Sequence, residues 1–78
     1  MNDFKNRILQ AVLTHAEAHI EKHKMNVEIQ CSNAVGVAEH GDHIETIEKE
    51  LEQIAHYQDI KDTVLKHFDF EAKQLLKD

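Results

Sequence analysis

The sequence predicts an all-α protein: a two-helix antiparallel hairpin that completes a four-helix bundle by homo-oligomerisation. The chain has no proline, both of its glycines fall within residues 31–43, and amphipathic helical periodicity runs on either side. Because glycine tolerates positive φ without steric cost, Gly36 and Gly41 mark the place where the backbone turns. The expected single domain, 1–78, divides into a helix over about 3–30, a corner over 31–42 and a helix over about 43–76.

The first helix is predicted by an apolar stripe whose members recur at steps of three and four. The stripe consists of Leu9, Val12, Ala16, Ile20, His23 and Val27. Towards its end, Val27, Ile29 and Cys31 also alternate with polar residues, a pattern typical of a strand, so a short β-ribbon within 27–37 is the alternative. We favour helix, because a lone two-stranded ribbon is marginal in water.

The second helix has a clear start signal. Asp42 can cap the first turn, and Glu45 follows it at the spacing of a capping box. An apolar stripe begins there with Ile44, Ile47, Leu51 and Ile54, and then shifts to Tyr57, Ile60, Val64 and Phe68. This shift predicts a stutter in the heptad after Ile54.

Size favours self-association. A single core is only marginally stabilising in a chain of 78 residues, and Cys31, the one cysteine, cannot form a disulfide within the chain. A folded hairpin is expected to leave several apolar residues partly uncovered: Leu13, Ile29, Tyr57, Ile60, Leu65 and Phe70. A homodimer or higher oligomer would cover them, with an interface built on Leu9, Val12, Ala16, Ile20, Leu51, Ile54 and Val64. The glycines of the corner permit the arms either to fold back or to exchange between subunits.

Charge and hydropathy exclude several classes of partner. The formal charge of −6 argues against direct nucleic-acid binding, and no apolar run approaches the ~20 residues of a membrane span. A reduced cytoplasmic protein is expected. Residues 39–52 contain six carboxylates and only one lysine, Lys49. A solvated helix face explains this run; an acidic inhibitor that occupies a basic site on a host factor is an alternative function.

Histidines form the first candidate site. His15, His19 and His23 are spaced i, i+4, i+8, and imidazoles at i, i+4 on a helix can chelate one divalent metal. No cofactor is otherwise expected, so the alternative function is a His-rich protein that binds Zn or Ni through His15 and His19. His23 also lies on the apolar stripe, where it can instead be a hydrogen-bonded interface residue. Protonation of all seven histidines would change the formal charge from −6 to +1, which predicts pH-sensitive oligomerisation.

The corner holds the second candidate site, a contact surface formed by Glu39, His40, Asp42 and His43. Neighbouring carboxylates and imidazoles can act as general bases or orient metal ligands. Polar residues at a helix start also satisfy free N–H groups, and we favour this structural role. No nucleophile, base and oxyanion set and no nucleotide-binding fingerprint is recognisable, so we expect no enzymatic activity.

The corner and the second helix carry a resemblance. The strings Asn33-Ala-Val-Gly-Val-Ala-Glu-His-Gly-Asp, Ile44-Glu-Thr-Ile-Glu-Lys-Glu-Leu and Ile54-Ala-His-Tyr-Gln-Asp resemble a family of small uncharacterised proteins from marine cyanophages. The family pattern reads Asn-Pro-Val-Gly-Ile-Gly-Glu-His-Pro-Asp, and this chain departs from it at Ala34, Ala38 and Gly41, which would relax the corner. The resemblance implies a phage origin, action in an infected host cell or in the virion, and host or virion proteins as partners.

Together these observations predict a non-enzymatic, self-associating helical hairpin that acts as a binding or assembly module, as a phage accessory protein would.

Overall fold

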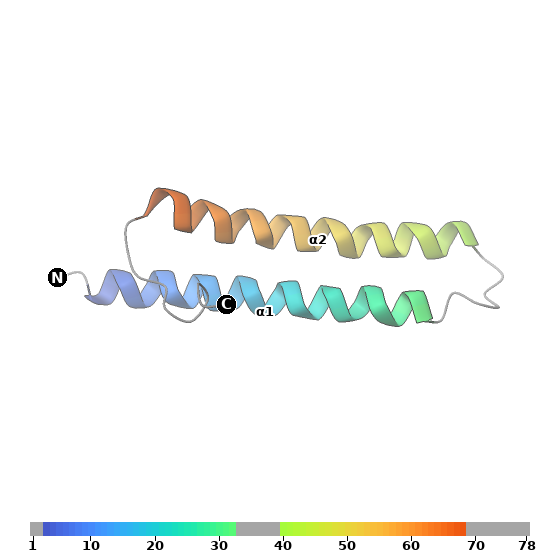
Figure 1. Cartoon of the computed structure of the whole chain (residues 1–78), viewed down its shortest axis with the longest axis horizontal. Helices are drawn as coiled ribbons and strands as arrows, with labels where there is room; N and C mark the ends of the chain where they lie inside the picture. The colour runs from blue at the N-terminus through green and yellow to red at the C-terminus, as the bar shows by residue number, and fades with distance from the viewer. Residues whose placement is uncertain (1–2, 33–39, 69–78) are drawn as a thin grey trace.

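Two long helices lie side by side in the computed structural model, which describes residues 3–32 and 40–68 (Figure 1). Helix α1 spans Asp3–Ser32 and helix α2 spans His40–His67. They run antiparallel, because the cross-helix contacts join Glu17 in the middle of α1 to Lys61 near the end of α2, and Gln30 near the end of α1 to His43 near the start of α2. The predicted all-α fold with two packed helices is confirmed.

The helix boundaries differ from the predicted ones. Helix α1 continues through 27–32, so those residues are helical and not part of a ribbon, while 33–39 lie outside the described residues. Helix α2 begins at His40, which places Asp42 inside the first turn instead of at the cap. Gly41 then lies inside the helix, which costs only about 1 kcal/mol. Asp42, an acidic residue in the first turn, complements the helix dipole. The described helix ends at His67, and residues 69–76 of the predicted second helix lie outside the described residues.

The seam between the helices keeps a regular heptad spacing of four and three along both elements. Its residues are buried or half-buried: Leu9, Leu13, Ala16, Ile20, His23, Val27 and Gln30 of α1, and His43, Ile47, Glu50, Ile54, Tyr57, Lys61 and Val64 of α2. The stutter predicted after Ile54 is therefore wrong. Glu50 and Lys61 occupy two of these seam positions with polar side chains. A search for apolar residues alone therefore does not recognise the regular heptad spacing.

Leu13 is the centre of the core, which corrects the prediction that it would be partly uncovered. It is 0% exposed and packs with buried Val64, while Leu9, Val12 and Leu65 cover the pair. Leu9 is followed by apolar residues at both +3 and +4, so spacing alone could not decide which of Val12 and Leu13 faces α2. The helix pairing places Leu13 against Val64.

The hairpin buries little apolar surface. Among the described residues, the buried hydrophobic side chains are Leu13, Ala16, Ile20 and Val64. Seven large hydrophobic side chains are instead between 45% and 71% exposed: Phe4, Ile8, Met25, Ile29, Ile44, Leu51 and Phe68. These unpartnered side chains are the starting point for a functional surface.

Candidate functional site

A polar cluster crosses the middle of the seam. His23, only 9% exposed, donates from Nδ1 to Oε1 of Glu50 over 2.6 Å, and the amide of Asn26 donates to the same oxygen over 3.1 Å. These two hydrogen bonds lower the pKa of Glu50, since they favour its charged form. His23 is thus a hydrogen-bonded residue between the helices, as its place on the apolar stripe allowed.

Two further polar contacts fix the register of the hairpin. Lys61 Nζ donates to Oε1 of Glu17 over 2.9 Å, and the His43 ring donates from Nε2 to the carbonyl oxygen of Gln30. A polar residue at a seam position is satisfied only when its partner lies opposite it, so such positions specify alignment at a cost in stability. His43, one of the four corner candidates, therefore has a structural role.

Four histidines surround Tyr57 on one side of the seam. The His19 ring stacks on Tyr57 with a centroid distance of 4.3 Å and an interplanar angle of 11°. The His15 ring lies 4.5 Å from that of His19, and the His56 ring meets Tyr57 edge-on at 4.8 Å. The stacked rings of His19 and His23 are 6.1 Å apart, which links this cluster to the polar cluster of the seam.

This arrangement changes the titration of His19. Burial lowers its pKa from 6.5, and the neighbouring charges of His15, Lys22 and His23 lower it further. Its Nδ1 atom is buried without a hydrogen-bond partner. The folded chain therefore favours the neutral imidazole at this position.

A shallow apolar groove lies beside the histidine cluster. It has a volume of about 610 Å³ and is lined by Ile8, Ala11, Val12, His15, Ala16, His56, Tyr57 and Ile60. A second hollow, lined by Phe4, Lys5, Ile8, Leu9 and Phe68, adjoins it through Ile8. The groove thus continues the apolar surface towards Phe4, in the half of the hairpin away from the corner.

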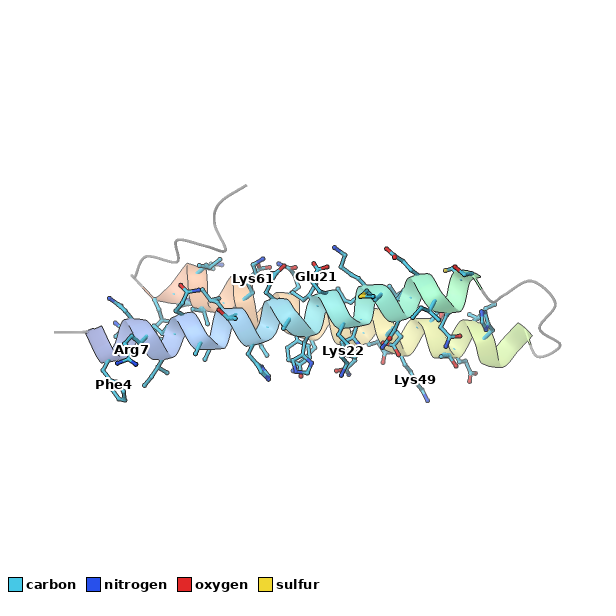
Figure 2. The ribbon with its side chains drawn as sticks, turned by 90° about the horizontal axis from the view of Figure 1, so that it is seen from below. Phe4, Arg7, Glu21, Lys22, Lys49 and Lys61 are labelled. Atoms are coloured by element: carbon cyan, nitrogen blue, oxygen red, sulfur yellow. The ribbon has the colours of Figure 1, made fainter. Side chains whose placement is uncertain are left out.

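Charge is segregated between the two flanks of the hairpin. The flank that holds the groove carries the positive charges of Lys5, Lys22 and Lys49 and also the histidines His15, His19 and His56. When it is continued at steps of three and four through residues 4–32 and 43–68, it contains no Asp or Glu, and the next such position towards the corner is Asp42. Figure 2 shows Phe4, Lys22 and Lys49 on the lower side of the hairpin and Glu21 and Lys61 on the upper side. We call the first side the groove flank.

The opposite side, the acidic flank, combines carboxylates with exposed apolar residues. Its carboxylates are Glu17, Glu21, Glu28, Glu48 and Asp62. Leu51 lies nine residues before Ile60, which is two and a half helical turns, so these two side chains point to opposite flanks. Ile44 lies seven residues before Leu51 and shares its face. The carboxylates therefore border an apolar strip formed by Ile44 and Leu51.

The structure distributes the predicted interface residues over three environments. Ala16, Ile20 and Val64 are buried within the hairpin, and Leu9, Val12 and Ile54 are half-buried. Leu51 is 49% exposed, because the seam passes through Glu50 instead. Of the predicted corner site, Glu39 lies outside the described residues, as do the side chains of His40 and Asp42.

The predicted metal ligands are only partly brought together. His15 and His19 are neighbours, whereas the imidazole of His23 is engaged by Glu50. Among residues 3–32 and 40–68, no group of three or more His, Cys, Asp or Glu side chains is placed to hold a metal ion. Binding of Zn or Ni by His15 and His19 stays a prediction.

Sequence reasoning missed the groove. It placed Val12 on the first stripe and expected Tyr57 and Ile60 to be uncovered, but it did not combine these residues into one surface. Charge was the usable signal: over residues 4–32 and 43–68, the positions that flank the seam at steps of three and four carry carboxylates on one side and none on the other.

Comparisons with protein-family models, with curated proteins and with solved structures find no match for this chain. The resemblance to marine cyanophage proteins therefore stays a prediction, as do a host or virion partner, an acidic inhibitor of a host factor and a cytoplasmic location. In the part of the chain that the structure describes, neither helix is long and apolar enough to cross a membrane.

Proposed function

We propose that the chain is a non-enzymatic assembly module that binds further copies of itself. The observation that carries this proposal is the imbalance between four buried hydrophobic side chains and seven large ones that stay at least 45% exposed in the described residues. Exposed apolar patches of this kind, rimmed by polar groups, are typical of interaction sites.

Pairing of hairpins accounts for the imbalance in a simple way. Two antiparallel hairpins laid against each other bring four helices around a common apolar core, which is the usual way in which such helices cover their second face. The groove is the natural place for contact, because Ile8, Val12, Tyr57 and Ile60 form a continuous apolar surface there. A four-helix unit of two paired hairpins is therefore the smallest assembly in which we expect the module to act.

The test is the solution mass of the purified chain across a wide concentration range, measured by sedimentation with and without a chelator. We expect a mass above the 9.0 kDa of one chain, independent of the chelator. Ile8→Glu places a charge in the groove and should reduce the mass to that of a monomer, since a buried unpaired charge opposes association.

Met25→Glu is the matched control. Met25 is 60% exposed and lies midway between the seam residues His23 and Val27, so it points away from α2 and from the groove. The same charge change there should leave the mass unaltered. A wild-type chain that stays monomeric at every concentration would contradict the proposal.

A further inference from the structure

We infer that neighbouring copies associate through unlike surfaces, with the groove flank of one hairpin on the acidic flank of the next. This inference rests on the proposed self-association and specifies its geometry. It follows from the distribution of charge and apolar residues over the two flanks.

A groove-to-groove contact would bring like charges together. Lys5, Lys22 and Lys49 of one copy would face the same lysines of the other across the interface. Over residues 4–32 and 43–68, no Asp or Glu on this flank could offset them. Juxtaposed like charges oppose association and select against such a pairing.

Contact between two acidic flanks has the same defect with the opposite sign. Glu21, Glu48 and Asp62 would meet their counterparts. The lysines on this side are already engaged within the hairpin, since Lys24 pairs with Glu21 at 3.3 Å and Lys61 pairs with Glu17 at 2.9 Å. Neither symmetric arrangement therefore matches charge with charge.

A groove-to-acidic-flank contact satisfies both requirements. The lysines of the groove flank would face the carboxylates of the acidic flank, which is the complementary arrangement that gives specificity. The apolar residues also correspond: Ile44 and Leu51 form a short exposed strip at helical spacing, which the groove around Ile8 and Ile60 can receive. Exposure of Leu51 is then explained by a partner that covers it.

The position of the two surfaces adds a constraint. The groove lies towards the chain ends of the hairpin, whereas Ile44 and Leu51 lie towards the corner. Successive hairpins must therefore be staggered along their length or reversed. A contact between unlike surfaces leaves one free groove and one free acidic flank on every pair, so assembly continues into a ring or a filament.

Complementation between two variants tests this geometry. Ile8→Glu disables the groove and keeps the acidic flank, while Leu51→Lys disables the acidic flank and keeps the groove. Both positions are about half exposed, so each variant should keep the helical circular dichroism of the wild type. Met25→Glu and Asp59→Asn, on the outward faces of α1 and α2, are the charge-matched controls.

The expected masses follow from counting intact surfaces. The wild type should grow beyond a dimer with concentration, and each variant alone should be monomeric. An equimolar mixture of the two variants should form a complex of two chains and stop there, because its remaining surfaces are both disabled. The controls should assemble as the wild type does.

Two results would overturn the inference while leaving the proposed function intact. Leu51→Lys alone could keep the mass of the wild type, which would mean that assembly does not need the acidic flank and that grooves pair with grooves. The mixture could instead stay monomeric although the wild type assembles, which would mean that the groove of one copy does not bind the acidic flank of another. A wild type that is monomeric throughout contradicts the proposed function itself, so the two failures are distinguishable.

Discussion

His23 Nδ1 lies 2.6 Å from Glu50 Oε1, and this contact places a carboxylate at a seam position between two helices that are otherwise joined mainly by aliphatic residues. Asn26 donates to the same oxygen. Polar groups at seam positions are satisfied in one register only, so the pair aligns α1 against α2. The alignment in turn stacks the rings of His19 and Tyr57 on each other and places Ile60 in the lining of the groove.

Removal of the acceptor should therefore weaken the hairpin. In Glu50→Ala, His23 and Asn26 lose their shared partner, and a buried donor left without an acceptor is destabilising. We expect a lower urea midpoint than that of the wild type, measured by circular dichroism. Glu52→Ala is the control: Glu52 is exposed, and a surface change of this kind should leave the midpoint almost unchanged.

The double variant His23→Leu with Glu50→Leu should not lose the stability that Glu50→Ala loses. Replacement of both members of a buried polar pair by aliphatic residues is often neutral or stabilising. The midpoint should return to the wild-type value or exceed it. If Glu50→Ala and the double variant lose the same stability, then the pair does not act as a unit.

Leu13 and Val12 provide a test of the core. Leu13→Ala should cost about 2–5 kcal/mol of unfolding free energy, the usual range for a fully buried leucine. Val12→Ala should cost clearly less, because Val12 is only half-buried and lines the groove. Urea denaturation of both variants in the Ile8→Glu background separates hairpin stability from assembly. Equal losses would mean that Leu13 is not the centre of the core.

The same two residues show what the sequence could and could not predict. Periodicity and the glycine-bearing corner were sufficient for the two antiparallel helices. They did not distinguish Val12 from Leu13, because apolar residues at +3 and +4 fit the same helical stripe. The partner helix makes that choice, and information about packing between distant segments is absent from local spacing.

Glu50 and Lys61 illustrate a second limit. A search for apolar residues passed over both, chose Leu51 for the seam and inferred a break after Ile54. Each of these charged residues is acceptable at the seam only because Glu17, His23 or Asn26 lies opposite it. Such pairings join residues 24 to 44 positions apart, so they become visible only when the two helices are placed together.

His19 should make the hairpin sensitive to pH. Because burial lowers its folded-state pKa below 6.5, the unfolded chain binds more protons just below that value. The stabilising contribution is thus complete above about pH 6.5 and declines as the pH falls further. Glu50, with its pKa lowered below 4.5, adds a further loss only under more acidic conditions.

Replacement of His19 by phenylalanine tests whether this residue causes the pH dependence of stability. His19→Phe can keep the stack on Tyr57 but cannot titrate, so its thermal midpoint should fall less than that of the wild type between about pH 7 and pH 5. His67→Phe, at the exposed end of α2, should retain the wild-type pH dependence. An identical pH dependence in wild type and His19→Phe would show that His19 does not carry the effect.

Zinc binding distinguishes the assembly module from the His-rich metal-binding alternative. The rings of His15 and His19 lie 4.5 Å apart, but His23 is held by Glu50, and no third ligand joins them among the described residues. A structural zinc site normally has four ligands, so two imidazoles should give only weak binding. Calorimetric titration with zinc chloride should show this weak binding lost in His15→Ala and in His19→Ala, and retained in His67→Ala.

Assembly of the wild type should proceed equally with and without zinc. Tight stoichiometric binding, together with a mass that depends on the metal, would instead favour a metal-binding protein and would place the histidine cluster, not the charge of the flanks, at the centre of its function.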